Sequence, residues 1–331
     1  MRHRQGQGQG TVASIGALIL GAVMALAQAP AAAQSYPNRP VRMIVPFGAG
    51  GGTDTISRLV SKKMEESLGQ SIVVENKPGA NTIIGADAVA KSAPDGYTLL
   101  LSLDLTMTMN PALYSKLPYD IDKDFTAVGR VARSQVIYVT NAKQPFQDIT
   151  QFIAYAKANP NKVTYGAGAI SSQVVGEQFA RATGIDMVYS NYKSGAEAML
   201  AMLQGDIQLA IMDIPTVLPN IKEGKLRALA VSGEERVPLL PQTPTIGEAG
   251  LPDLKYRSWW GIFAPAGTPK PVVDKLNASL KTALESEDLR ARMTALTFTP
   301  AYSTPAELAA EQREDVAKYR TIIKAAGLSL D

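Results

Sequence analysis

The sequence predicts an α/β protein of two lobes, each a mostly parallel sheet flanked by helices, with two crossing strands as the hinge. From Val41 onward, short β-rich runs alternate with helical patterns, as in βαβ construction. Residues 131–140 contain strand-like pieces that follow one another with no helical pattern between them. The chain ends in three helical patterns that have no strands of their own, so they need an existing sheet to pack on. The simplest arrangement is that the chain returns to the first lobe near Tyr256, so that the terminal helices pack on its sheet. The predicted boundaries are 34–136 plus 257–331 for lobe 1 and 137–256 for lobe 2.

The elements of the first lobe are predicted from periodicity and turn signals. Apolar residues at spacings of three and four, closed by Gly69, indicate the first helix. Loop signals at 76–79 and 95–96 separate the next elements. The predicted strands are 41–45, 71–75 and 97–102, and the predicted helices cover about 54–68 and 83–91. This order is typical of a parallel, right-handed α/β layer.

The second lobe is predicted from another alternating set. Its helices are expected at 148–159, 172–183, 196–205 and 215–224, and its strands at 163–168, 186–190, 207–213 and 226–232. A strand at 258–264 then leads into the terminal helices at 271–286, 287–296 and 305–327. Trp259 and Trp260 lie in that strand, and we expect one to be a core or hinge residue and at most one to reach a ligand.

The N-terminus has the pattern of a secretory signal peptide. A basic start is followed by an apolar run too short for a comfortable membrane span, and small residues at Ala31 and Ala33 suit cleavage before Gln34. An uncleaved amphipathic anchor is the alternative. We therefore exclude residues 1–33 from the fold and expect the mature protein in the periplasm.

Composition excludes several classes of site. Without Arg2 and Arg4 the formal net charge falls from +3 to about +1, which argues against a nucleic-acid partner. The only histidine, His3, leaves with the same segment, and the chain has no cysteine. Such a chain cannot build a Ser-His-Asp triad, a thiolate nucleophile, a His or Cys metal site or a disulfide. We expect no cofactor, no metal and no catalysis.

The glycine-rich turn "VPFGAGGGTD" lies between the first strand and the first helix. It is open to three interpretations: a tight turn without ligand, a dinucleotide fingerprint, or a carboxylate-binding turn. The fingerprint should end in Gly or Ala where Thr53 stands, and Asp54 would oppose a pyrophosphate. Backbone N–H groups and the positive end of the helix favour an anion, and Thr53 or Asp54 can cap that helix. The candidate ligand-binding residues here are Phe47, Ala49, Gly50, Gly51, Thr53 and Asp54.

A similar turn occurs in the second lobe, in "YGAGAISSQVVGEQF". Ser171 and Ser172 are predicted to start the helix, either simply as N-cap residues or as ligand contacts. In α/β sheets the carboxyl ends of strands point at the crevice where ligands bind, so two such turns would face each other across it. The candidates here are Gly168, Ala169, Ser171 and Ser172.

Other polar residues follow strands and are expected at the same crevice. Tyr192 and Asp213 follow second-lobe strands, with Thr216 close behind, and Asp104 and Thr106 hold the equivalent place in the first lobe. Asp213 either caps the helix near Thr216 or faces the ligand, and the sequence leaves both open.

These residues resemble a known family, the Bug-type periplasmic receptors of tripartite tricarboxylate transporters. The resemblance covers essentially the whole mature chain. It rests on "YPNRPVRMIVPFGAGGGTD", "VVENKPGA", "APDGYTLLL", "NPALY", "GKLRALAVSGEER", "PTIGEAGLP" and "WWGIFAPAGTP", in the family's order and spacing.

The resemblance implies a two-lobe Venus flytrap, type II-like, that binds a small carboxylate without chemistry and delivers it to a membrane transporter. It implies that one ligand carboxylate is held by the loops Phe47 to Asp54 and Gly168 to Ser172, partly through water, while variable residues meet the other end. It also implies that Asp213 and Tyr192 line the second lobe. The chain departs from many relatives at Gln173, where they carry a histidine, and this puts any pH-dependent role in doubt.

The sequence therefore predicts a monomeric periplasmic solute-binding protein for an organic acid, with a dicarboxylate, aliphatic or aromatic, preferred. Its partners would be the small acid and the membrane subunits of the transporter. We expect the two lobes to close over the acid by hinge rotation. Two alternatives stay open at this point: a periplasmic enzyme using carboxylates such as Asp54 with Asp213, and a receptor that reports its ligand to a signalling partner.

Overall fold

The computed structural model describes Met1 and residues 36–331. By its contacts the chain divides into Met1–Asn38 and Arg39–Asp331, and the second unit contains every helix and strand described here. The predicted signal peptide and its cleavage site near Ala33 lie outside the described residues. Among the described residues, no helix is long and apolar enough to cross a membrane.

The first sheet has the strand order β11-β4-β10-β3-β1-β2. Its strands are β1 (Val41–Val45), β2 (Ile72–Asn76), β3 (Thr98–Leu103), β4 (Phe125–Ser134), β10 (Ser258–Pro265) and β11 (Thr299–Pro300). β1 pairs in parallel with β2 and β3, as predicted, whereas β10 runs antiparallel to β3 and β4. The sheet contains antiparallel pairs, because the returning strand β10 enters its middle in the opposite direction.

The helices of the first sheet come from both ends of the chain. They are α2 (Gly52–Leu68), α3 (Ile83–Ala90), α4 (Asp104–Thr108), α5 (Asn110–Leu113), α10 (Lys270–Glu285), α11 (Glu287–Ala295) and α12 (Pro305–Ala326). α10 packs on α2 and β4, and α12 packs on β4, α4 and α5, so the terminal helices do return to this sheet. α4, α5 and β11 were not predicted, because they are too short to show a period.

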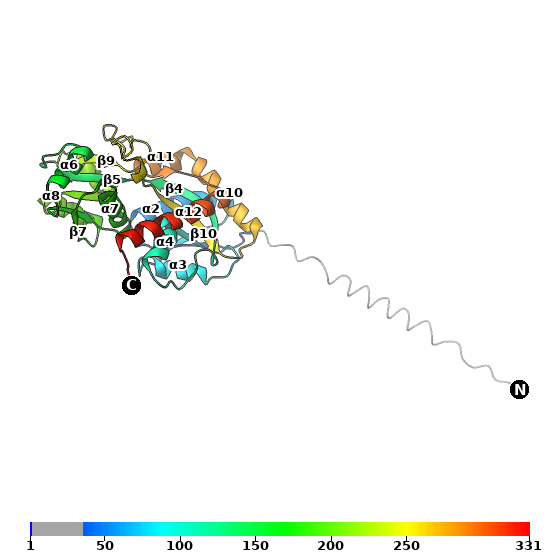
Figure 1. Ribbon diagram of the computed structural model, residues 1–331. Helices are drawn as coiled ribbons and strands as arrows, with labels where there is room; N and C mark the ends of the chain where they lie inside the picture. The colour runs from blue at the N-terminus through cyan, green and yellow to red at the C-terminus, as the bar shows by residue number, and fades with distance from the viewer. Residues whose placement is uncertain (2–35) are drawn as a thin grey trace. The chain divides into compact units, whose positions relative to one another are not determined.

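The second sheet has the strand order β7-β6-β8-β5-β9. Its strands are β5 (Val136–Asn141), β6 (Val163–Ala167), β7 (Met187–Asn191), β8 (Leu209–Asp213) and β9 (Leu226–Val231). Its helices are α6 (Ile149–Ala158), α7 (Ile170–Thr183), α8 (Gly195–Gln204) and α9 (Ile214–Lys222), and the 3-10 turn η1 (Pro252–Leu254) follows β9. β6 is parallel to β7 and β8, while β5 is antiparallel to β8 and β9. Figure 1 shows α6, α7 and α8 grouped around the green strands of this sheet.

Two segments connect the sheets, and one serine is hydrogen-bonded to both segments. β4 ends at Ser134 and β5 starts at Val136, while the chain returns through Tyr256 into β10. The buried Ser232 hydroxyl accepts the N–H of Val136 at 3.0 Å and donates to the carbonyl of Tyr256 at 2.7 Å. The backbone of Ser232 bonds to both segments as well. The crossing strands predicted as a hinge are thus bound to each other at Ser232, while the exact lobe boundaries stay a prediction.

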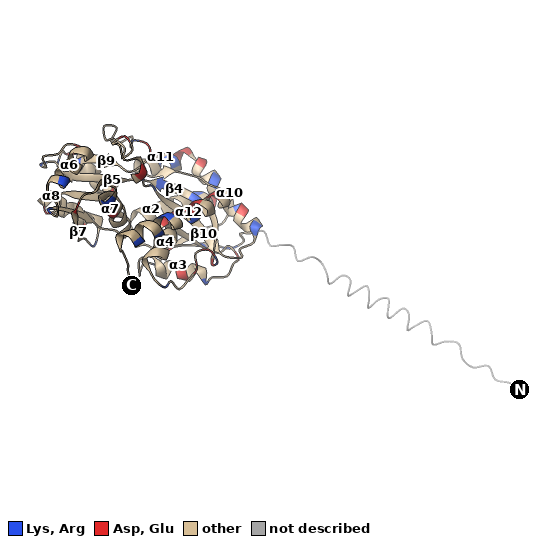
Figure 2. Cartoon of the chain, in the orientation of Figure 1, with Lys and Arg blue, Asp and Glu red and all other residues tan. Residues whose placement is uncertain are grey.

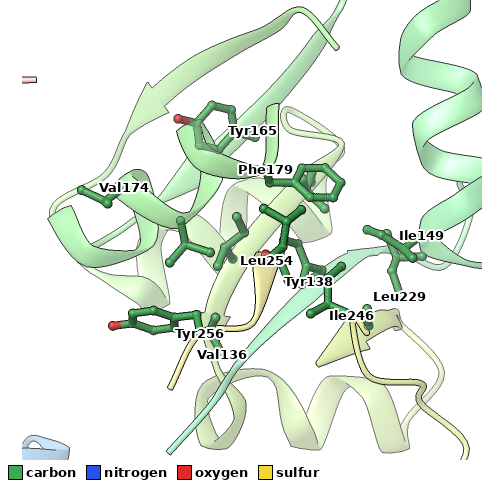
Figure 3. Packing of buried hydrophobic residues seen from close by; sticks show 14 of the residues in the cluster. Val136, Tyr138, Ile149, Tyr165, Val174, Phe179, Leu229, Ile246, Leu254 and Tyr256 are labelled. Atoms are coloured by element: carbon green, nitrogen blue, oxygen red, sulfur yellow. The ribbon is translucent and has the colours of Figure 1, made fainter. Parts of the chain in front are cut away.

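The largest hydrophobic cluster lies mainly on one face of the second sheet (Figure 3). Tyr138, Phe152 and Phe179 are fully buried there, with the rings of Tyr138 and Phe179 5.1 Å apart. Leu105 from α4 and Tyr319 from α12 belong to the same cluster, and α7 packs on α12. The two sheets therefore share buried apolar surface beside the crossing strands.

Charged residues are interspersed over the molecule. Figure 2 shows Lys and Arg alternating with Asp and Glu along α10, α11 and α12. Pairs such as Lys270 with Asp274 and Arg292 with Asp288 are exposed, so they contribute little to stability.

Candidate functional site

One cavity of about 400 Å³ is lined by residues of both sheets and their helices. The beginnings of α2, α7 and α9 contribute to it, together with β10, the β4–β5 junction and the loop after α11. Its lining residues are Phe47, Gly48, Gly51, Gly52, Thr53, Leu103, Leu105, Ser134, Val136, Ala169, Ser171, Ser172, Asp213, Pro215, Thr216, Ser258, Trp260, Thr297 and Phe298. A concave space with apolar walls and a few polar groups has the character of a small-molecule site.

The glycine turn forms the start of α2. Gly50 has a φ of 83°, a conformation that favours glycine, and Gly51 is the N-cap residue in extended backbone. No side chain caps this helix, so the prediction that Thr53 or Asp54 is the cap is wrong. The first N–H groups of a helix have no partner inside it, so those of α2 are available to a ligand at the cavity wall.

Asp54 instead stabilises the glycine turn through contacts of its side chain. Its carboxylate accepts hydrogen bonds from the N–H of Gly50 and the Asn76 amide, both at 2.9 Å, and pairs with Arg58 at 2.9 Å. Asn76 also donates to the carbonyl of Phe47 at 3.1 Å. Burial raises the pKa of Asp54, but the hydrogen bonds from Arg58, Gly50 and Asn76 outweigh burial and leave the pKa lowered. Asp54 is therefore an ionised structural brace of the turn, and it does not line the cavity.

Thr53 is oriented by a tryptophan. The indole N–H of Trp260 donates to the Thr53 hydroxyl at 2.9 Å, and both residues are buried. The hydroxyl oxygen accepts that bond, so its own proton can be donated to a ligand. The ring of Trp260 meets Phe298 edge to face, with centroids 4.9 Å apart. The neighbouring Trp259 is fully buried and donates to Asp315, so Trp260 is the tryptophan that reaches the cavity.

The second turn forms the start of α7. This helix begins at Ile170 with Ala169 as N-cap, so Ser171 and Ser172 lie in its first turn. Of the two alternatives for these serines, the N-cap role is therefore wrong. Because Ala169 carries no capping oxygen, the first N–H groups of α7 also lack a side-chain partner. At Gly168 a Cβ would lie 2.1 Å from the backbone carbon of Ser194, so only glycine fits.

Asp213 ends β8 at the start of α9. It occupies the N-cap position, but its side chain forms no capping hydrogen bond, which answers the question that the sequence left open. The side chain is exposed and lines the cavity. Surrounding protein still displaces enough water to raise the pKa of Asp213 by desolvation.

The remaining predicted site residues are not among those that line the cavity. Ala49, Gly50, Asp54, Asp104, Thr106, Gly168 and Tyr192 do not line it. Asp104 is fully buried at the start of α4, where it accepts the N–H of Leu105. The hydroxyl of Thr106 donates to that of Thr82 at 2.9 Å. The side chain of Gln173, the departure from the relatives, does not line the cavity either. Of the pair Asp54 and Asp213, considered for an enzyme, only Asp213 lines the cavity.

Several lining residues had no signal in the sequence. Ser134, Val136 and Ser258 lie at the ends of the crossing strands. No sequence pattern indicates that residues at these positions line a cavity. Thr297, with a φ of 63°, and Phe298 arrive from the loop after α11. Threonine rarely adopts a left-handed backbone conformation, and such conformations concentrate at functional sites. The sequence does not indicate this conformation.

The chemistry of the lining suits an anion held without basic side chains. Among the lining residues there is no Lys, Arg or His. Two uncapped helix starts and the hydroxyls of Thr53, Ser171 and Ser172 supply donors. Helix N-termini with free N–H groups bind carboxylates in this way.

Comparison with known proteins assigns the chain to a family. Residues 56–328 match the model of the tripartite tricarboxylate transporter family receptor. The chain is 34% identical to the protein BugT of Bordetella pertussis, over 91% of this chain and 94% of that one.

Solved structures agree with that assignment. A structure of R. palustris Rpa4515 with adipate is 31% identical, with a TM-score of 0.79, covering 89% of this chain and 99% of that one. MatC from Rhodopseudomonas palustris with bound malate is 33% identical, with a TM-score of 0.74, covering 87% and 100%. The resemblance to Bug-type receptors is confirmed, and the chain belongs to the receptor family of tripartite tricarboxylate transporters.

Proposed function

We propose that this protein captures a small organic carboxylate between its two lobes and delivers it to the membrane subunits of a tripartite tricarboxylate transporter. It acts as a monomer in the periplasm, after removal of the signal peptide, and returns its ligand unchanged. One ligand carboxylate lies at the starts of α2 and α7.

The observation that carries this proposal is the pair of uncapped helix starts on one cavity. α2 and α7 belong to different sheets, and neither has a side-chain cap. Both contribute their first residues to the same lining, and no basic side chain competes for the anion there. A carboxylate bridging the two would be bound by both lobes and would therefore favour the closed state.

The comparisons support the ligand class. The neighbours named with adipate and malate are both bound to dicarboxylates. A dicarboxylate, as preferred from the sequence, is one candidate for this chain, and its second carboxylate would then have to be accommodated elsewhere in the same cavity.

A thermal-shift screen over organic acids identifies the ligand. A ligand at 100 times its Kd stabilises the folded state by about 2.7 kcal/mol, which such a screen detects. Recovery of the bound compound unchanged after incubation separates a receptor from an enzyme.

Isothermal titration of two variants then tests the site. Gly51→Val should fold, because Gly51 has extended backbone and a Cβ there meets only the Gly48 carbonyl, at 3.8 Å. It places two methyl groups at the cavity wall and should weaken binding at least tenfold, and Ser172→Ala should weaken it several-fold. Ser61→Ala is the matched control, because Ser61 is buried in α2 with no hydrogen-bond partner for its hydroxyl. Unchanged affinity in both site variants would contradict the proposal.

A further inference from the structure

Phe298 places an aromatic ring beside the start of α2. The residue lies between α11 and β11, and its side chain is 7% exposed and lines the cavity. A Cβ added at Gly52, the first residue of α2, would lie 3.3 Å from the Cζ atom of this ring. The ring is therefore next to the helix start that the proposed function assigns to the ligand carboxylate.

Trp260 supports the ring of Phe298 from the neighbouring strand. The two rings meet edge to face, with centroids 4.9 Å apart. The indole N–H of Trp260 donates to the hydroxyl of Thr53 at 2.9 Å, and both of these residues are buried. The two rings thus form one apolar wall that is held against the first turn of α2.

The backbone that carries Phe298 is held in a strained conformation. Thr297 has a φ of 63°, and its carbonyl accepts the hydroxyl of Ser134 at 3.4 Å. The N–H of Phe298 donates to the carbonyl of Met293 at 2.9 Å, and the next two residues pair with β4. Such a conformation persists only where the surrounding structure determines it. The position of the Phe298 ring is therefore fixed from both sides.

This wall leaves little room beside the helix start. A single carbon atom added at Gly52 would already come closer to the Phe298 ring than an ordinary van der Waals contact. A ligand carboxylate at the start of α2 would have its adjacent carbon atom near the same wall. A methylene group adds only hydrogen atoms there, whereas a methyl branch needs space that a close-packed wall does not yield without moving side chains.

We propose that Phe298 is a specificity-determining residue: its ring, supported by Trp260, admits acids that are unbranched at the carbon next to the bound carboxylate and excludes acids that are branched there. This inference rests on the proposed function, because it takes the position of the carboxylate from it. The selection acts by steric exclusion, so a smaller side chain at this position should widen the range of acids and not abolish binding.

Isomeric diacids test the position of the branch. Isothermal titration compares glutarate with 2,4-dimethylglutarate and 3,3-dimethylglutarate, and adipate with 2,5-dimethyladipate and 3,4-dimethyladipate. In each set the two dimethyl acids have the same composition and charge, and only the first is branched next to its carboxylates. We expect the wild-type protein to bind the first isomer at least about tenfold more weakly than the second, as methyl groups in an apolar pocket allow.

Phe298→Leu tests the residue. Leucine is smaller and still apolar, and it changes no side-chain hydrogen bond, so the variant should fold. We expect the affinity ratio between the two isomers to fall several-fold, mainly because the acid branched next to its carboxylates binds more tightly.

Phe125→Leu is the matched control. Phe125 lies in the same sheet, is 8% exposed, meets Tyr119 edge to face at 5.6 Å and does not line the cavity. Thermal unfolding should show similar losses of Tm for the two variants, while the control leaves the affinity ratio as in the wild type. A lower ratio in Phe298→Leu alone is then an effect on selection and not on stability.

The outcomes separate this inference from the proposed function. Equal wild-type affinities for the two isomers, a ratio unchanged by Phe298→Leu, or loss of all binding in that variant overturns the inference and leaves the proposed function standing. Binding of none of these acids at millimolar concentration also overturns the inference, because they include the class that the wall should admit. The proposed function is then decided separately, by whether any acid in the thermal-shift screen binds.

Discussion

Replacing Asp54 by asparagine should loosen the glycine turn and destabilise the fold. The carboxylate serves three donors: the N–H of Gly50, the amide of Asn76 and the guanidinium of Arg58. An asparagine offers one acceptor oxygen for them, and its own NH2 group faces donors. Asp54 is buried, whereas Arg58 is half exposed and can be rehydrated in the variant.

The magnitude follows from those contacts. A hydrogen bond to a charged group contributes about 1.5–3 kcal/mol, and the exposed end of Arg58 adds little, so we expect a loss of about 2–3 kcal/mol. For a large domain each kcal/mol shifts Tm by roughly 2–4 °C, so Tm should fall by about 4–12 °C at neutral pH. Asp288→Asn, which removes an exposed pair with Arg292, should cost about 0.5 kcal/mol or less.

The direction of the pKa shift of Asp54 fixes how the Tm difference between wild type and Asp54→Asn changes with pH. The pKa of Asp54 is lowered in the folded state, so its contribution is present above the unfolded pKa and is lost as the pH falls through the folded pKa. Thermal unfolding followed by circular dichroism should therefore show the largest gap between wild type and Asp54→Asn at neutral pH, closing below about pH 4. Equal Tm values at pH 7, or a gap that widens in acid, would show that ionised Asp54 does not stabilise the turn.

Three further perturbations have definite expected outcomes. Asp104→Asn should raise Tm, because burial and nearby acids raise the pKa of Asp104 and one of its oxygens has no partner. The cost of this acid grows as the pH rises from the unfolded pKa up to the raised folded pKa, so the gain in Tm should increase above about pH 4. A lower Tm for the variant at pH 7 would contradict this expectation. Gly168→Ala should destabilise the start of α7 and weaken ligand binding, since the new Cβ would lie 2.1 Å from backbone; wild-type Tm and affinity by calorimetry would count against the close approach. Trp260→Phe should cost about 1 kcal/mol in urea unfolding through the lost hydrogen bond to Thr53, and an unchanged midpoint would show that this bond contributes nothing.

Most of the fold could be predicted because period and turn residues agree along the chain. The strand from Val41 to Val45 and the helix closed by Gly69 have strong patterns, and both are found. The antiparallel placement of β10 could not be predicted, because it depends on which strands are neighbours and not on the pattern of β10 itself. The short helix at 104–108 was missed, and with it the burial of Asp104.

The two turns of the site could be predicted, but not their detailed roles. Glycine content located the turns. Whether a residue caps the helix, stabilises the turn or contacts the ligand depends on the exact residue at which the helix begins, and a difference of one or two residues changes the role. Asp54 and Ser172 both lie inside the helices that they were expected to cap. The contribution of Phe298 depends on a loop far away in sequence, and no local signal marks it.

The most direct measurement is a crystal structure of the protein with a carboxylate found by the thermal-shift screen. We expect a ligand carboxylate in the cavity with oxygens about 2.7–3.2 Å from donors at the starts of both α2 and α7. A ligand bound outside this cavity, or one whose carboxylates all contact Lys or Arg side chains, would contradict it.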